Sequence, residues 1–208
     1  MHTLPVRLNT TSVASWQILL KRCLDIAFAM VALILLTPVL LFILIKTKLS
    51  SRGPVFFTQK RIGLHGRSFT IYKFRSMIVN AEEKGPALSF DGDKRITKWG
   101  KVMRKWRLDE LPQLINILQG EMSLVGPRPE RAFYIHQISA INPNYKLLFD
   151  VKPGLTSLGM VQYGYASSVE EMLERMKYDL AYIDRFSLLL DFKIMFYTLR
   201  LILSGKGK

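Results

Sequence analysis

Near the N-terminus the chain carries one uninterrupted hydrophobic run. Residues 26–45 read IAFAMVALILLTPVLLFILI and include no charged residue. As an α-helix this run would extend about 30 Å, which matches the hydrocarbon thickness of a bilayer. The pattern therefore predicts a membrane-associated helix over about residues 20–48, within an N-terminal anchor that occupies residues 1–52.

A proline interrupts this run and suggests how the helix meets the membrane. Pro38 removes a backbone donor and bends or breaks a helix, and the hydroxyl of Thr37 can satisfy part of the exposed backbone. Basic residues lie on both sides of the run, at Lys21, Arg22, Lys46, Lys48 and Arg52. Because positive charge marks the cytoplasmic side, this symmetry favours a re-entrant hairpin broken at Thr37 and Pro38. A kinked spanning helix is the alternative.

After residue 52 the pattern becomes β-rich. Two stretches, PVFFTQKRI and RSFTIYKFRSM, flank a glycine-bounded turn and predict a hairpin. Basic side chains crowd this hairpin, at Lys60, Arg61, Arg67, Lys73 and Arg75. They are either a solvated edge that resists aggregation or a surface for phosphate. Residues 81–93 are then a loop over a site or a simple connection.

Residues 96–120 have the spacing of a helix that stops at Gly120. Pro112 is comfortable only in a first turn, so we expect a helix that begins near Leu108 or Asp109. Asp109 and Glu110 would then lie at its positive end, where a carboxylate is stabilised and phosphate can approach. The two acids either complement the helix dipole alone or take part in chemistry with Arg104 and other basic residues just before them.

Farther along, a stiff loop and two helices are predicted. Arg128 lies between Pro127 and Pro129, which would hold its guanidinium on an extended support suited to phosphate; pairing with Glu130 or Glu121 is the alternative. Residues 152–165 look turn-like. Ser168 and Glu171 form a capping-box pattern before one helix. The last helix, within residues 186–203, is apolar nearly all round, which favours partial burial in a membrane interface over burial in the domain.

These elements predict an α+β fold. It would be a mainly helical, membrane-associated domain with a small β-hairpin, in which residues 53–208 form a cytosolic, interfacial unit behind the anchor. The 208 residues include 30 Lys and Arg against 16 Asp and Glu, a net charge of +14 that favours polyanions such as nucleic acid, anionic membrane lipids or phosphorylated substrates. The single cysteine excludes an internal disulfide, and no Walker A or GxGxxG pattern is present.

Four segments together resemble the bacterial sugar transferase family. They are KFRSM at 73–77, DKRITKWGKVMRKWRLDELPQL at 93–114, MSLVGPRP at 122–129 and KPGLTSLGMVQ at 152–162. The resemblance is to monotopic polyprenol-phosphate phosphoglycosyl transferases, in a minimal form. It implies a re-entrant helix at the cytoplasmic face of the bacterial inner membrane. It also implies transfer of a phospho-sugar from a UDP-sugar to undecaprenyl phosphate with release of UMP, the first membrane step of glycoconjugate biosynthesis.

The resemblance also implies roles for individual residues. The family's catalytic Asp-Glu dyad falls on Asp109 and Glu110, with Asp109 forming a covalent phosphosugar intermediate and both carboxylates holding Mg²⁺. A phosphate-binding arginine falls on Arg104, and the Pro-Arg-Pro loop of the donor site falls on residues 127–129. Lys73 and Arg75 are further candidates for donor binding. An N-acetylated amino sugar is favoured, and self-association stays open.

Two other classes of function fit the charge and the anchor. A membrane-anchored nucleic-acid-binding protein would explain the net charge, and a membrane scaffold would explain the apolar run. Both would leave the adjacent carboxylates at 109 and 110 without a task, so the enzyme is preferred and no nucleic acid is expected as a partner.

Overall fold

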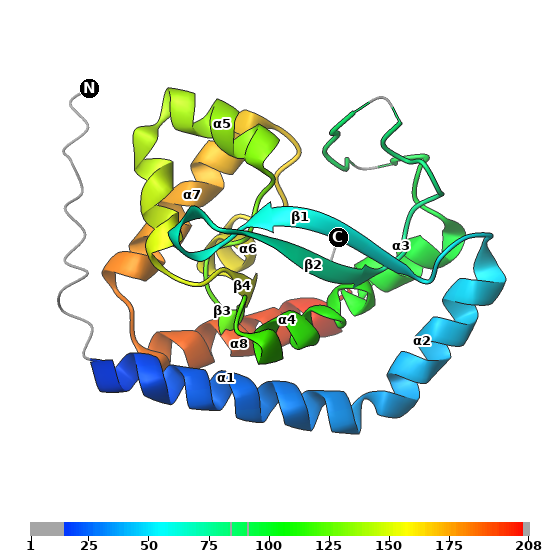
Figure 1. Cartoon of the computed structure of the whole chain (residues 1–208), viewed down its shortest axis with the longest axis horizontal. Helices are drawn as coiled ribbons and strands as arrows, with labels where there is room; N and C mark the ends of the chain where they lie inside the picture. Colours follow the sequence, from blue (N-terminus) through cyan, green and yellow to red (C-terminus); the bar gives the residue numbers. More distant parts are fainter. Residues whose placement is uncertain (1–14, 84, 91, 206–208) are drawn as a thin grey trace.

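The computed structural model describes residues 15–83, 85–90 and 92–205. In this part of the chain, helices surround two small two-stranded sheets, which confirms the predicted mixture of helices and a small sheet (Figure 1). The helices are α1 (Ser15–Leu35), α2 (Thr37–Ser50), α3 (Lys98–Lys105), α4 (Gln113–Gln119), α5 (Ala132–Ile141), α6 (Leu158–Gln162), α7 (Val169–Asp184) and α8 (Leu188–Leu203). The strands are β1 (Phe56–Ile62), β2 (Ser68–Phe74), β3 (Ser123–Val125) and β4 (Gly154–Thr156). Short 3₁₀ helices are η2 (Leu64–Gly66), η3 (Leu108–Glu110) and η4 (Pro143–Asp150).

The hydrophobic run forms two helices that meet at an angle. The axes of α1 and α2 differ by 64° across Leu36, and Pro38 lies in the first turn of α2. The Thr37 hydroxyl donates to the carbonyl of Leu33 at 2.7 Å, as predicted for a helix broken at this point. No single helix among the described residues is long and apolar enough to cross a membrane, whereas this bent pair meets the requirement of length and composition together.

Polar side chains near the start of α1 fix that helix to the rest of the protein. Arg22 donates to two carbonyls in the last turn of α4, at 2.6 and 3.0 Å. The buried carboxylate of Asp25 accepts the backbone N–H of Leu124 at 3.0 Å, and Lys21 pairs with Asp191 of α8 at 2.6 Å. Lys21 and Arg22, which the sequence pattern presents as charges beside a membrane segment, therefore also hold α1 against the domain.

The predicted hairpin is present and lies over α4 (Figure 1). β1 and β2 pair antiparallel from Phe56 opposite Phe74 to Ile62 opposite Ser68. Asn116 of α4 joins the two layers: its Oδ1 accepts the N–H of Tyr72 at 3.2 Å and its Nδ2 donates to the carbonyl of Thr70 at 2.7 Å. Because the Asn116 side chain is fully buried, these hydrogen bonds fix how α4 sits beneath β2.

The helical stretch at 96–120 differs from its prediction. α3 ends at Lys105, and Arg107 adopts a left-handed conformation with φ of 51°, which ends the helical run. Leu108, Asp109 and Glu110 then form the 3₁₀ turn η3, and α4 begins only after Pro112. A helical turn thus begins at Leu108 as expected, but it is a short 3₁₀ turn, and the two acids lie on it rather than at the N-terminus of α4.

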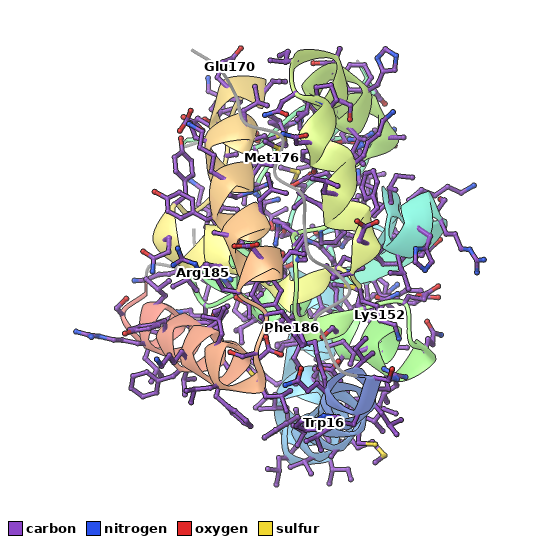
Figure 2. The ribbon with its side chains drawn as sticks, turned by 90° about the vertical axis from the view of Figure 1, so that its left-hand side faces the viewer. Trp16, Lys152, Glu170, Met176, Arg185 and Phe186 are labelled. Carbon is purple, nitrogen blue, oxygen red and sulfur yellow. The ribbon has the colours of Figure 1, made fainter. Side chains whose placement is uncertain are left out.

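The C-terminal half contains the largest core. The turn-like segment at 152–165 in fact includes β4, which pairs in parallel with β3, and the short helix α6. A side chain on Gly154 would collide with the backbone of Gly126, so glycine allows the two segments to approach. The Ser168 hydroxyl accepts the N–H of Glu171 at 3.2 Å, which confirms the predicted N-cap of α7. Figure 2 shows α7 standing above α8 and α1, with Arg185 at the end nearest α8.

Removal of the Asn116 side chain should destabilise the protein. In Asn116→Ala the N–H of Tyr72 and the carbonyl of Thr70 lose buried partners, which lowers the free energy of unfolding by about 1–3 kcal/mol. Gln119→Ala, at an exposed position of the same helix, is the matched control and should stay close to wild type. Thermal unfolding of the purified proteins in detergent measures both. Equal melting temperatures for the two variants would contradict the role given to Asn116.

Candidate active site

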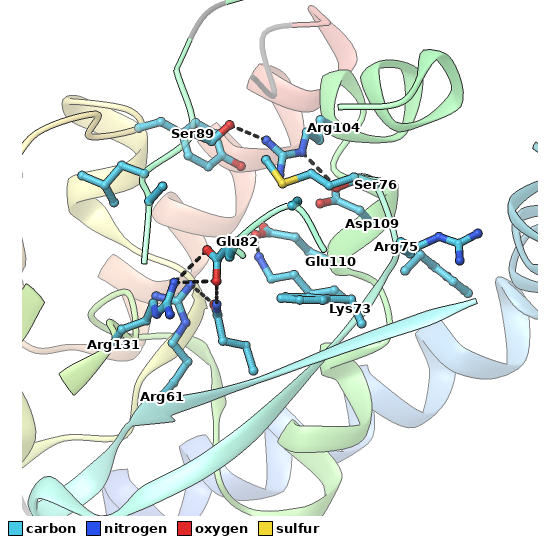
Figure 3. Close-up of a pocket in the computed structure, with 18 of the residues that line it drawn as sticks. Arg61, Lys73, Arg75, Ser76, Glu82, Ser89, Arg104, Asp109, Glu110 and Arg131 are labelled. Atoms are coloured by element: carbon cyan, nitrogen blue, oxygen red, sulfur yellow. Dashed lines mark hydrogen bonds and ion pairs between the residues drawn. The ribbon is translucent and has the colours of Figure 1, made fainter. Parts of the chain in front are cut away.

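A cavity of about 540 Å³ lies between the hairpin, the loop that follows it, η3 and the segment around Arg128 (Figure 3). Its lining includes six of the residues predicted for the site: Lys73, Arg75, Arg104, Asp109, Glu110 and Arg128. Pro127 and Pro129 do not line it; they line a small separate pocket beside η4. Of the Pro-Arg-Pro tripeptide, the arginine alone lines the large cavity.

Asp109 and Glu110 are adjacent buried carboxyls with different partners. Their exposed fractions are 7% and 4%. One oxygen of Glu110, Oε1, accepts from Lys73 Nζ at 2.7 Å and from Arg128 NH2 at 2.9 Å. Within the described part of the chain, Asp109 takes part in no ion pair of this kind. The turn thus presents one carboxylate that is held by two cations and one that is left for another partner.

The two carboxyls also differ in acidity. Burial raises the pKa of Glu110, but Arg128 and Lys73 more than offset it and hold that pKa well below its ordinary value. Burial and the nearby charge of Glu110 raise the pKa of Asp109, while Lys73 and Arg104 oppose the rise. The surroundings of Glu110 therefore favour its charged form, whereas burial disfavours the charged form of Asp109 and the nearby cations oppose that effect.

Arg104 and Arg75 have different positions relative to these carboxyls. Arg104 donates from Nε to the Ser76 hydroxyl at 3.0 Å and from NH1 to the Ser89 hydroxyl at 2.6 Å, which holds its guanidinium at the cavity (Figure 3). The guanidinium of Arg75 is directed away from Glu110 and donates to the carbonyl and hydroxyl of Ser51, at 2.8 and 2.9 Å. Arg75 thus connects the end of β2 to the end of α2, whereas the guanidinium of Arg104 lies at the cavity.

The hairpin's basic residues divide between the two alternatives that the sequence left open. Lys60 and Arg67 are exposed, as expected of a solvated edge. Lys73 and Arg61 line the cavity instead. Arg61 donates to Glu130 at 2.8 Å. Only part of the basic face is therefore available to a phosphate group.

A second ion cluster supports Arg128 and was not predicted. Glu130 accepts from Arg61 of β1 at 2.8 Å and from Arg175 of α7 at 2.7 Å. Arg128 itself pairs with Glu110, not with Glu130 or Glu121, and its guanidinium lies 5.2 Å from the ring centre of Tyr165. Arg175 lies on the face of α7 that also buries Met172 and Met176, and a charge within an apolar stripe is the signal that could have identified it.

The loop at 81–93 contributes to the cavity wall. Glu82 and Ser89 line the cavity, and Glu82 accepts two hydrogen bonds from Arg131, at 2.7 and 2.9 Å. Ser89 accepts from Arg104, as described above. The described residues of this loop therefore lie over the site, in agreement with the first of the two predicted alternatives.

Comparison with known proteins identifies the family. The family model described as "Bacterial sugar transferase" matches residues 16–205. This chain belongs to the bacterial sugar transferase family. The match covers α1, the hairpin, η3, α7 and α8. The family assignment made from the four sequence segments is therefore confirmed.

Curated members of the bacterial sugar transferase family resemble the chain over most of its length. A protein of Aeromonas hydrophila named UDP-N-acetylgalactosamine-undecaprenyl-phosphate N-acetylgalactosaminephosphotransferase is 45% identical over 90% of this chain and 44% of its own length. The UDP-glucose:undecaprenyl-phosphate glucose-1-phosphate transferase of Escherichia coli is 41% identical over 95% of this chain and 43% of its own length. The uncharacterised sugar transferase EpsL of Bacillus subtilis is 39% identical over 91% of this chain and 90% of its own length. The chain thus spans less than half of the first two relatives.

Replacement of Glu130 should destabilise the fold of this family member. Glu130→Gln leaves Arg61 and Arg175 buried without their anion, a change that costs about 3–5 kcal/mol when a buried ion pair is broken. Glu174→Gln breaks an exposed pair with Lys177 on the same helix as Arg175 and should change stability little. Unfolding measurements on both variants test the difference.

The pH dependence of this effect has a defined sign. Burial raises the pKa of Glu130, but Arg175 and Arg61 more than offset it, so the folded-state pKa lies below the ordinary value. The stabilisation is then present above the ordinary glutamate pKa and is lost as the pH falls through the lowered value. The gap between wild type and Glu130→Gln should therefore narrow in acid, and a gap that widens would contradict the ion cluster.

Proposed function

We propose that this chain transfers a sugar phosphate from a UDP-sugar to undecaprenyl phosphate, with Asp109 as the covalent nucleophile and UMP as the first product. The names of the Aeromonas and Escherichia relatives describe transfer of a sugar phosphate from a UDP-sugar to this lipid. The observation that carries the proposal for this chain is the pair of buried carboxyls: Glu110 forms ion pairs with two cations, whereas Asp109 forms none with the residues that the structure describes. Transfer of the sugar phosphate to the lipid would begin the synthesis of a bacterial polysaccharide or another glycoconjugate.

The reaction divides into two displacements at one phosphorus atom. A carboxylate oxygen of Asp109 attacks the β-phosphorus of the UDP-sugar, the bond to the oxygen that bridges the two phosphorus atoms breaks, and UMP leaves with that oxygen. A phosphate oxygen of the lipid then attacks the same phosphorus and releases the Asp109 carboxylate. The product is a lipid diphosphate sugar. Neither step needs an oxidant, and one phosphoanhydride is exchanged for another.

Charge neutralisation is the main demand of such a reaction, because anionic groups must approach an anionic phosphate. Arg104, Lys73 and Arg128 line the cavity with the carboxyls. Arg104 also lowers the pKa of Asp109 and so supports its charged form, against the opposing effect of burial. We assign Arg104 to the transferred phosphate, and Arg128 beside Tyr165 to the nucleotide end of the donor.

Mg²⁺ is proposed as the cofactor. Among the described residues, no group of three or more His, Cys, Asp or Glu side chains is placed to hold a metal. Mg²⁺ often needs only one or two carboxylates, with waters and substrate phosphates as its remaining ligands, and the oxygens of Asp109 and Glu110 suit that set. When bound, the ion supplies positive charge to the donor phosphates. Chelation by EDTA, followed by re-addition of Mg²⁺, tests this assignment.

The exposed apolar surface supports a site at a membrane. Large hydrophobic side chains are exposed along α1, α2 and α8, among them Leu35, Phe42, Leu49, Phe196 and Leu203. We propose that the α1–α2 pair is a re-entrant anchor and that α8 lies in the interface with anionic lipids, at the cytoplasmic face of the bacterial inner membrane. This places the cavity beside the lipid substrate, as the reaction requires.

Loss of the nucleophile should abolish both half-reactions. Asp109→Asn removes the attacking carboxylate, so release of UMP in detergent should fall by at least about 10³-fold. Mass spectrometry of wild type incubated with a UDP-sugar should show a phosphosugar adduct on the peptide that contains Asp109, and the variant should show none. A panel of UDP-sugars in the same assay identifies the sugar.

Asp184→Asn is the control, since Asp184 is exposed at the end of α7. It should keep wild-type turnover. Release of UDP would instead indicate a conventional glycosyltransferase, and full activity of Asp109→Asn in cells would support a scaffold. Either result would overturn the proposal.

Loss of the Arg104 charge should slow the first half-reaction. Arg104→Gln keeps a polar side chain but removes the cation beside the transferred phosphate, and we expect formation of the adduct to fall by about 10²–10³-fold. Lys101→Gln, an exposed cation on the same helix, should have no such effect. Single-turnover measurement of UMP release tests the pair. Equal rates would remove Arg104 from the phosphate site.

A further inference from the structure

The lining of the cavity combines two kinds of side chain. The carboxyls of η3 lie there with Lys73 and Arg128. The lining also includes an apolar part, which consists of Pro54, Phe56, Phe57, Met77, Ile78 and Val79 and is here called the apolar end. The exposed fractions of Phe57, Ile78 and Val79 are 41%, 52% and 50%, so this end is an open apolar surface and not part of the core. A UDP-sugar, which is polar along its whole length, does not account for such a wall.

The apolar end lies against the second anchor helix. Phe56 stacks on Phe74 with ring centres 5.3 Å apart, and Phe74 is buried in one cluster with Ile43 of α2. Val55 packs on the same cluster. Figure 1 shows α2 leading directly into the start of β1. An apolar chain lying in this end of the cavity would therefore continue onto the exposed face of α2.

One cation, Arg75, lies beside these apolar residues, with its guanidinium close to Gly53 and Val79. Arg75 belongs to the same segment, but its guanidinium donates to Ser51 and is turned away from the carboxyls (Figure 3). The guanidinium of Arg104 is held by the hydroxyls of Ser76 and Ser89. The cavity thus combines cationic side chains that suit phosphate with apolar side chains that suit hydrocarbon.

We propose that the surface formed by Pro54, Phe56, Phe57 and residues 77–79, here called the apolar mouth, binds the isoprenoid units next to the phosphate of the acceptor lipid. The inference rests on the proposed function and adds a binding site to it. The lipid phosphate lies near Asp109, and its chain leaves through the apolar mouth toward α2. A polar donor and an apolar acceptor thereby reach the same aspartate within one cavity.

A chase of the covalent adduct distinguishes binding of the acceptor lipid from a role in the reaction with the UDP-sugar. Wild type and variants are first loaded with a UDP-sugar, freed of UMP, and then mixed with either UMP or undecaprenyl phosphate. UMP reverses the first step, and the lipid completes the second. In Ile78→Asn and Phe57→Ser we expect an unchanged chase with UMP and an apparent KM for the lipid that rises about tenfold or more, since burial of one such side chain favours binding on that order.

Ile141→Asn is the matched control for Ile78→Asn. Ile141 is 62% exposed on α5 and does not line the cavity. It should leave both chases as in wild type. The amount of adduct that each variant forms reports whether it is folded, and a variant that forms none is replaced by Val79→Asn, which changes the same wall.

The outcomes are distinct. A raised KM for the lipid with a normal UMP chase supports the apolar mouth. Wild-type KM for the lipid in Ile78→Asn and Phe57→Ser overturns it, and so does a slower UMP chase with normal lipid transfer, which would give this surface to the donor sugar. Failure of wild type to form any adduct would overturn the proposed function instead. Cross-linking by a diazirine-labelled farnesyl phosphate should mark peptides at 54–57 and 77–79, and marking elsewhere alone would contradict the assignment.

Discussion

The site depends on the meeting of Lys73, Arg128 and Glu110 at one carboxylate oxygen. Lys73 comes from 37 residues before Glu110 and Arg128 from 18 residues after it, so this contact joins the hairpin, the carboxylate turn and the Pro-Arg-Pro loop. Burial of two cations and two carboxyls is unfavourable unless they compensate one another. Glu110 compensates part of the positive charge of Lys73 and Arg128. The rest of that charge can act on Asp109 and on an anion that enters the cavity.

Much of the fold follows from local sequence signals. The proline within an apolar run predicts the bend between α1 and α2, alternation around a glycine turn predicts the hairpin, and Ser168 predicts the start of α7. The start of α4 could not be predicted in this way, because Arg107 has no side-chain feature that marks a left-handed residue. Likewise, Arg22 next to an apolar run looks like a membrane flank, and only the tertiary structure places the end of α4 beside it.

The candidate site, too, could be predicted only in part from the sequence. Asp109, Glu110, Arg104 and Arg128 stand close together in the chain or in short motifs, and the fold brings them to one cavity with Lys73. Arg175 could be noticed as a charge within an apolar stripe of α7, but its pairing with Glu130 could not be inferred, since the two residues are 45 positions apart. Pairings between distant charges depend on how whole elements pack, and neither spacing nor composition records that packing.

Neighbouring residues connect α2 to the candidate site. On β2, Lys73 reaches Glu110 while Phe74, the next residue, packs on Ile43 of α2. On α3, Arg104 lies at the cavity while Met103 is buried in that same cluster. Successive strand residues point to opposite faces, and adjacent helix positions also diverge, so each segment can pack on α2 with one side chain and present a cation to the cavity with the next. A shift of α2 would therefore move the cations, which makes the position of α2 part of the geometry of the site.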